Sequence, residues 1–151
     1  MFETLISKLQ EDKYLTLETT PQHEPSMHNI VEKIKKFKID SKVDGFTCTD
    51  NPLAKLKYNS LFAALKLQQE FKKPVIATMT MRDRNKIALQ SDLLGANDFD
   101  IRAILALTGD PANMSDQPNS KGVFEANSLM LLKMIKSFNY GMDFAGRPFK
   151  I

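Results

Sequence analysis

The chain has 151 residues with 42% apolar side chains, which is enough for one domain with a substantial core and excludes a disordered chain. The net charge is only +3, from 21 basic and 18 acidic residues spread along the sequence, so nucleic acid is not an expected partner. Cys48 is the single cysteine, so no internal disulfide can form and a reducing compartment is the simpler interpretation.

The first predicted element is a helix over about residues 2–11. This stretch carries acidic residues such as Glu3 and Glu11 and has no long apolar core, so it is not a signal peptide. No segment approaches the ~20 consecutive apolar residues of a membrane-spanning helix. We therefore expect a soluble, cytoplasmic protein with no membrane partner.

Four strand-like runs follow, at intervals close to thirty residues. Each run is apolar or rich in threonine and ends in a polar loop, as buried parallel strands do. The runs span residues 14–20, 44–49, 74–80 and 103–108. Segments with the apolar spacing of helices lie between them and after the last. Ser26 is the expected N-cap of the first of these helices, and Gly95 and Gly141 are expected to end two later ones.

The alternation of strands and helices predicts βαβ units and a parallel sheet. Two α/β architectures remain open, an open doubly wound sheet and a (β/α) barrel. The first strand–helix turn, "ETTPQHEPS", contains no glycine and is therefore no dinucleotide-binding fingerprint. This weakens a nucleotide-binding open sheet without excluding open sheets in general.

Polar residues recur near the end of each predicted strand. Glu18, Thr47, Thr78 and Thr108 are separated by 29, 31 and 30 positions. Because side chains alternate along a strand, we expect one polar face and one apolar face. The polar face would hold Thr16, Glu18, Thr20, Thr47, Thr49, Thr78, Thr80, Ala106, Thr108 and Asp110, and the apolar face would hold Leu15, Leu17, Leu105 and Leu107.

Barrel enzymes place their sites at the C-terminal ends of the strands, where these polar residues would lie. The competing interpretation of any one threonine is that it is simply a good strand former. The two histidines, His23 and His28, and the distant Cys48 form no metal-like cluster, so no metal is expected. Neutral donors and acceptors with two acids suit a polar heteroaromatic ligand, and a carboxyl beside an apolar ring can serve as a general acid.

Five segments carry a resemblance to a known family. They are "LETTP", "DGFTCTDNPLAKLKYNSLFAA", "TMTMRDRNKIALQSDLLGA", "ILALTGDPANMSDQPNSKGVFEANSLMLLKMI" and "AGRPFKI". In order and spacing, over roughly residues 13–151, the sequence resembles the methylenetetrahydrofolate reductase family. It is similar to the branch that carries "DRN…LQSDLLGA" after the third strand. The resemblance implies a (β/α)8 barrel of the TIM type that binds FAD on its C-terminal face.

The resemblance also implies an activity, the flavin-dependent reduction of 5,10-methylenetetrahydrofolate to 5-methyltetrahydrofolate in one-carbon metabolism and methionine synthesis. Glu18 matches the general acid that assists the folate nitrogen, and Asp110 matches the aspartate near the flavin ring and the pterin. Residues that match flavin contacts at strand ends are Thr47, Thr78, Leu107, Thr108 and Gly109. Phe124 and Glu125 match the place where the fourth strand's loop meets the cofactor. The electron donor, NADH, NADPH or a ferredoxin-type protein, stays open.

The match departs from the family in sequence and in length. "LETTPQH" stands where many members have "EFFPP", Thr108 where some have arginine, and Thr78 where some have histidine. A barrel needs ~250 residues, so residues 1–151 form a single partial-barrel domain of about four βα units with an extra N-terminal helix.

A half barrel leaves two strand edges unpaired and needs a partner, which is a second copy, a separately encoded half or the rest of its own chain. We expect a fragment or half of the full reductase. The alternative is a non-catalytic half-barrel module that binds a partner chain and flavin without turnover. A barrel with different chemistry is a third, weaker interpretation.

Overall fold

The computed structural model describes residues 2–11 and 13–149. Within them, strands and helices alternate as expected and the strands form one parallel sheet in the order β1-β2-β3-β4. The strands are β1 (Thr16–Thr19), β2 (Gly45–Cys48), β3 (Val75–Thr80) and β4 (Ala103–Leu107). The helices are α1 (Phe2–Gln10), α2 (His28–Lys36), α3 (Ser60–Phe71), α4 (Lys86–Asp98) and α5 (Ser128–Asn139), with short 3-10 turns η1 (Asp40–Lys42), η2 (Pro52–Ala54) and η3 (Ala112–Met114).

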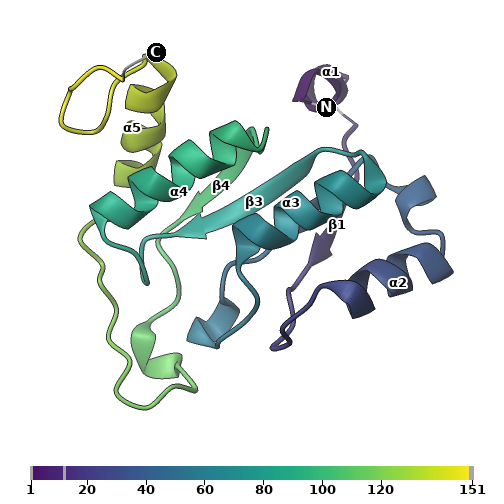
Figure 1. The fold of residues 1–151 in the computed structure, drawn as a ribbon, viewed down its shortest axis with the longest axis horizontal. Helices are drawn as coiled ribbons and strands as arrows, with labels where there is room; N and C mark the ends of the chain where they lie inside the picture. Colours follow the sequence, from purple (N-terminus) through teal and green to yellow (C-terminus); the bar gives the residue numbers. More distant parts are fainter. Residues whose placement is uncertain (1, 12, 150–151) are drawn as a thin grey trace.

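The helices α2, α3 and α4 cover one face of the sheet (Figure 1). The apolar side chains of that face form a core in which Phe46 is fully buried and its ring lies 5.2 Å from that of Phe71. A second core cluster joins Met79 and Met81 to α4 and to Leu131 of α5. These buried residues hold the helical layer against the sheet, and no helix of the described residues covers the opposite face.

The two ends of the sheet differ in what surrounds them. Helix α1 and the C-terminal end of α5 lie toward the end where the strands begin (Figure 1). The loops that follow β2 and β4, with η2 and η3, lie together at the other end, and the backbone N–H of Leu56 donates to Asp116 Oδ1 across 3.3 Å. The long loops therefore surround the C-terminal ends of the strands.

Asparagine side chains cap three of the helices. Asn59, Asn85 and Asn127 accept hydrogen bonds from backbone N–H groups in the first turns of α3, α4 and α5. Helix α2 differs from expectation, because Met27 occupies the cap position and Ser26 precedes it. The Ser26 hydroxyl still accepts a hydrogen bond from the backbone N–H of His28 at 3.0 Å.

The two glycines expected to end helices have different positions. Gly141 follows α5 with φ +74°, as expected for a residue that ends a helix. The prediction for Gly95 was wrong, because α4 continues through it to Asp98. Buried neighbours on both sides, Leu93 and Ala96, pack this turn against the core and outweigh the weak helix propensity of glycine.

The predicted orientation of the fourth strand was also wrong. Thr78 pairs with Leu105 and Thr80 with Leu107, so these leucines share the face of the threonines. Ala106 instead packs against the second core cluster. The segment "AILAL" is apolar at every position, so alternation along the chain could not decide which side chains face the helices.

Candidate functional site

The face of the sheet that carries no helices, called the inner face here, holds a polar row across three strands. The register pairs Glu18 of β1 with Thr47 of β2, and Thr78 of β3 lies on the same face one strand further on. Neighbouring strands lie about 4.8 Å apart, so Glu18 and Thr47 are immediate neighbours, whereas Thr47 pairs with Ile76 and Thr78 lies two residues further along β3. Glu18 is exposed, Thr47 is half-buried and Thr78 is buried. The row ends at Leu105 and Leu107 of β4, which are 45% and 42% exposed.

The N-terminal end of the inner face is closed by an aromatic side chain. Tyr14 precedes β1, and its hydroxyl lies so close to Gly45 that a Cβ at residue 45 would collide with it. Burial, with the nearby Asp44 carboxylate, raises the pKa of Tyr14 above its ordinary value. Gly45 therefore lets a bulky ring cover this end, while the other end stays open to a ligand.

Asp110 lies at the C-terminal end of the inner face and is attached to the neighbouring loop. Its Oδ2 accepts a hydrogen bond from the backbone N–H of Leu53, 2.6 Å away in η2. Gly109, directly before it, has φ +99°, and a Cβ there would lie 2.9 Å from Cβ of Arg82. Only glycine fits this conformation and this close approach. The backbone conformation of Gly109 therefore sets the position of Asp110.

A buried ion-pair network joins the ends of β2 and β3. Asp50 is 4% exposed, and its Oδ2 accepts from the backbone N–H and the hydroxyl of Thr80, both at 2.9 Å. Arg84 donates to both oxygens of Asp50, at 2.6 and 3.2 Å, and its Nε donates to Asp92 at 2.8 Å. Burial lowers the pKa of Arg84, but the hydrogen bonds and charges of Asp50 and Asp92 outweigh this and raise it. The network therefore connects the β2–α3 loop to α4.

A second arginine, Arg82, is more deeply buried. Its side chain is 2% exposed, and its Nε and Nη2 donate to the Asp83 carboxylate at 2.8 and 2.6 Å. Hydrogen bonding from Arg82 lowers the pKa of Asp83 against the opposing effect of burial. Arg82 Nη2 also donates to the backbone oxygen of Asn51 at 3.0 Å.

The structure brings together most, but not all, of the residues predicted for the site. Glu18, Thr47, Thr78 and Leu107 share the inner face, and Gly109 and Asp110 lie at its C-terminal end. Thr108 was predicted to lie in the same polar column and does not, because its hydroxyl accepts a hydrogen bond from the backbone N–H of Ser128 at the start of α5. Because Leu105 and Leu107 of β4 face the inner side, Thr108 points to the opposite side.

Phe124 and Glu125 lie in the loop before α5. Glu125 Oε2 accepts a hydrogen bond from the backbone N–H of Lys86 at 2.9 Å, so its carboxylate is engaged at the start of α4. The ring of Phe124 packs over Gly122, and its backbone has φ +41°. Glu125 is therefore bound to the start of α4, and the roles of both residues toward a cofactor stay predictions.

Sequence reasoning missed the charged residues at the C-terminal end of the inner face. Asp50 and Arg82 follow strands β2 and β3, and the signal was present in "TDN" and "RDRN", where charges come immediately after buried strands. Thr49 was placed in the polar column but not in the site. Its hydroxyl is buried and has no hydrogen-bond partner among the described residues.

Other features of the described part of the chain bear on the kind of site. A groove of about 470 Å³ runs between β1 and α2, and Glu18, Asn29 and Lys33 are among its lining residues. Within the described residues, no His, Cys, Asp and Glu side chains gather in a group of three or more that could hold a metal ion. No helix in residues 2–11 and 13–149 has the length and apolar character to cross a membrane.

Comparison with known proteins identifies a family. The family model described as "Methylenetetrahydrofolate reductase" matches residues 3–147, which is nearly the whole chain. No curated protein matches the sequence.

Proposed function

The chain belongs to the methylenetetrahydrofolate reductase family, and on that premise we propose that it forms the Glu18-bearing half of a flavin-dependent enzyme. The reaction is the reduction of 5,10-methylenetetrahydrofolate to 5-methyltetrahydrofolate, with electrons from a reduced nicotinamide or a protein donor. The observation that carries the proposal is that Glu18, Thr47 and Thr78 lie on one inner face that no described helix covers, with Asp110 at its C-terminal end. We place the reaction in the cytoplasm, because the single cysteine is free.

The inner face offers hydrogen-bonding groups and an apolar surface that suit the flavin ring of FAD. The hydroxyls of Thr47 and Thr78 and the unpaired buried hydroxyl of Thr49 can hydrogen-bond a heteroaromatic ring. Leu107 offers an exposed apolar surface for the flat face of that ring. Bound flavin supplies the hydride for the reduction.

Glu18 is the residue we assign to proton transfer. It lies at the exposed edge of the row, and no hydrogen bond from the described residues occupies its carboxylate. The carboxyl is therefore free to act as the general acid toward the folate nitrogen as the ring of the substrate opens. Asp110 has one oxygen bound to Leu53 and can use the other to orient the pterin.

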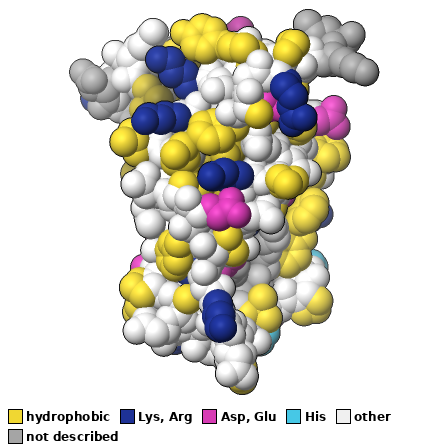
Figure 2. All heavy atoms as spheres, turned by 90° about the vertical axis from the view of Figure 1, so that its left-hand side faces the viewer, with side chains coloured by type: hydrophobic (Ala, Val, Ile, Leu, Met, Phe, Trp, Pro, Cys, Tyr) yellow, Lys and Arg dark blue, Asp and Glu magenta, His cyan; other side chains and the backbone are white. Residues whose placement is uncertain are grey.

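The exposed surface supports a partner that completes the barrel. The chain exposes 9323 Å², whereas a folded monomer of 17.1 kDa is expected to expose about 7,750 Å². The excess of about 1,600 Å² is twice what one side of a standard interface buries. Figure 2 shows hydrophobic side chains among basic ones on the side where α5 lies. The edges of β1 and β4 are the places where further parallel strands would pair.

Charge on the flanking helices favours another polypeptide segment over a second copy. In a barrel of two copies, α5 of one chain would lie against α2 of the other. Helix α5 contains Lys133 and Lys136 and no acidic residue, and the last turn of α2 contains Lys33, Lys35 and Lys36. Two basic helices repel each other, so we propose that a different βα segment supplies the missing strands.

The test begins with titration of the 151-residue chain with FAD, followed by flavin fluorescence and the visible spectrum. We expect saturable quenching with a shifted spectrum, and loss of folate reduction in Glu18→Gln with unchanged flavin affinity. Glu24→Gln is the matched control, because Glu24 is an exposed carboxylate nearby whose hydrogen bond is to Asn29. Folate reduction by Glu18→Gln at the parental rate would show that Glu18 is not the acid.

Sedimentation in the same buffer separates the remaining alternatives. A monomer that gains folate reduction when a complementary βα half is added supports the proposed partner. A tight dimer of this chain would show that a second copy is the partner instead. Flavin binding without turnover, even with the complementary half and a chemical reductant, would favour the non-catalytic module.

A further inference from the structure

Arg82 is a charged residue that lies where the inner face meets the loops. Along β3 and its continuation, Met79 and Met81 face the second core cluster, so Thr80 and Arg82 alternate with them on the other side. Even with the inner face open, the Arg82 side chain is 2% exposed. A guanidinium this deeply buried is uncommon unless its partners require it there.

Arg82 contacts all three loops at the C-terminal end of β2, β3 and β4. Its guanidinium bonds the Asp83 carboxylate in the β3–α4 loop and the backbone oxygen of Asn51 in the β2–α3 loop. Its own backbone oxygen accepts a hydrogen bond from Val123 N–H in the β4–α5 loop at 2.6 Å. One side chain and its peptide group therefore join three loops whose residues are far apart in the sequence.

The β2–α3 loop that Arg82 contacts has an unusual backbone. Asn51, Leu53 and Ala54 have φ of 42°, 56° and 56°, in the left-handed region that residues other than glycine rarely adopt. Such a backbone persists only where surrounding groups hold it. Arg82, which binds the oxygen of Asn51, and Asp110, which binds the N–H of Leu53, are two of the groups that hold this loop.

The stem of Arg82 also supports the residue before Asp110. Gly109 lies directly against Cβ of Arg82, so the position of the arginine sets how closely the β4–α5 loop approaches β3. The last nitrogen of the guanidinium, Nη1, is buried and has no hydrogen-bond partner among the described residues. Unsatisfied buried donors are rare, and in native proteins they are found where a group is retained for function.

We propose that Arg82 is a positioning residue, which fixes the β2–α3 loop and the Gly109 turn so that the Asp110 carboxylate stays bound to the backbone of Leu53. The geometric part of this proposal stands on the contacts above. Its consequence for catalysis, that a displaced Asp110 orients folate poorly, rests on the proposed function.

Arg84 provides a matched control. It is also a buried arginine in the β3–α4 loop, with two carboxylate partners, Asp50 and Asp92, and a side chain that is 11% exposed. Its hydrogen bonds do not reach Asn51, Leu53 or the Gly109 turn in the described structure. Replacing Arg84 therefore removes a buried arginine side chain without removing a contact to Asn51, Leu53 or the Gly109 turn.

The test is amide hydrogen exchange at Leu53 in the chain without added ligand. We expect Arg82→Gln to raise the exchange rate of this amide about tenfold, and Arg84→Gln to raise it less than about threefold at a similar loss of thermal stability. Arg82→Lys is the second variant, since it keeps the stem under Gly109 and the charge. It loses the forked contact to Asp83 and Asn51 and should give an intermediate rate.

A double variant with Asp110→Ala checks that the effect acts through Asp110. In that background the Leu53 amide has already lost its acceptor, so Arg82→Lys should add less than about twofold to the exchange rate. Unchanged Leu53 exchange in both Arg82 variants, or an equal increase in Arg84→Gln, would overturn the proposal.

The exchange experiment needs neither flavin nor folate, so it separates the two proposals. If the parent chain fails to bind FAD while Leu53 responds to Arg82 as expected, the proposed function fails and the positioning role stands. In a reconstituted enzyme that turns over, Arg82→Lys should lower kcat while the Kd for FAD changes less than about twofold. A weakened Kd with unchanged kcat would contradict a role through Asp110.

Discussion

Removal of the Asp50 carboxylate tests whether the buried network holds the C-terminal end of the sheet together. Asp50→Ala deletes the acceptor of four hydrogen bonds, two from Thr80 and two from Arg84. Arg84 then keeps only Asp92, whose side chain is 34% exposed, and the Thr80 donors lose their acceptor. This is the case of a buried ion pair broken from one side.

The expected cost follows from that geometry. Breaking a buried pair while leaving the other charge in place costs about 3–5 kcal/mol in the free energy of unfolding. A domain is stable by about 5–15 kcal/mol in total, so the variant should lose a large part of its stability. With a urea m-value of about 2 kcal/mol per molar, the midpoint of unfolding should fall by roughly 1.5–2.5 M.

Asp92→Ala is the matched control, because Asp92 binds the same guanidinium from a partly exposed position. We expect it to lower the free energy of unfolding by about 1 kcal/mol or less, since Arg84 keeps its buried partner. The double variant Asp50→Ala with Arg84→Met should be more stable than Asp50→Ala alone, because no buried charge is left without its partner. Equal midpoints for Asp50→Ala and Asp92→Ala would refute the reasoning.

Two further predictions concern single positions. Gly109→Ala should lower the free energy of unfolding in urea by about 2–3 kcal/mol, because residue 109 has φ +99° and an added Cβ would contact Arg82. Gly95→Ala, in a helix with open space around residue 95, should instead raise this free energy by about 0.5–1 kcal/mol. Equal effects of the two substitutions would argue against the turn geometry. Burial raises the pKa of the Cys48 thiol from 9.0 to about 11 against the opposing effect of its hydrogen bond with Thr19. The unfolded thiol therefore ionises first as the pH rises, and stability should fall by about 2–3 kcal/mol between pH 9 and 11 in the parent but not in Cys48→Ala; parallel stability curves would contradict this.

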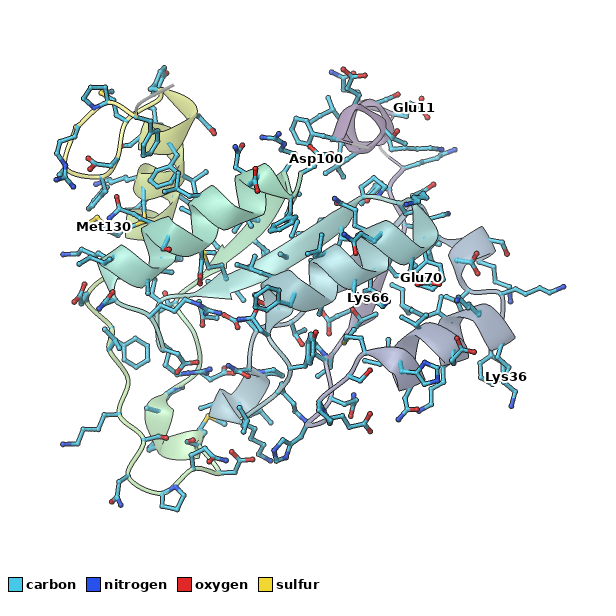
Figure 3. All side chains as sticks on the ribbon, in the orientation of Figure 1. Glu11, Lys36, Lys66, Glu70, Asp100 and Met130 are labelled. Atoms are coloured by element: carbon cyan, nitrogen blue, oxygen red, sulfur yellow. The ribbon has the colours of Figure 1, made fainter. Side chains whose placement is uncertain are left out.

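The outer surface is not expected to affect the site. Lys66 and Glu70 project from α3 on the helical layer, away from the inner face (Figure 3), and Glu70 pairs with Lys35 and Lys66. Hydrogen bonding to Lys35 lowers the pKa of Glu70. Such solvent-exposed pairs contribute little to stability. Substitutions in the buried network of Asp50, Arg84 and Asp92 are therefore expected to change the stability more.

The sequence by itself determined the order and type of the main elements. Apolar runs near positions 16, 45, 75 and 103, separated by helical spacing, predicted the four parallel strands and the helices between them. The family motifs indicated Glu18 and Asp110 as a pair before any geometry was known. These signals are local, because strand and helix periodicity and motif residues can be recognised within a few neighbouring positions.

Only the tertiary structure decided which residues share a face and which charges meet. "AILAL" is apolar throughout, and pairing with β3 was needed to turn Leu105 and Leu107 toward the inner face and to carry Thr108 away from it. Asp50 and Arg84 are 34 positions apart, and the Arg82 contacts join three separate loops. The periodicity of a single element cannot predict these long-range contacts, because they depend on how the strands are arranged in the whole sheet.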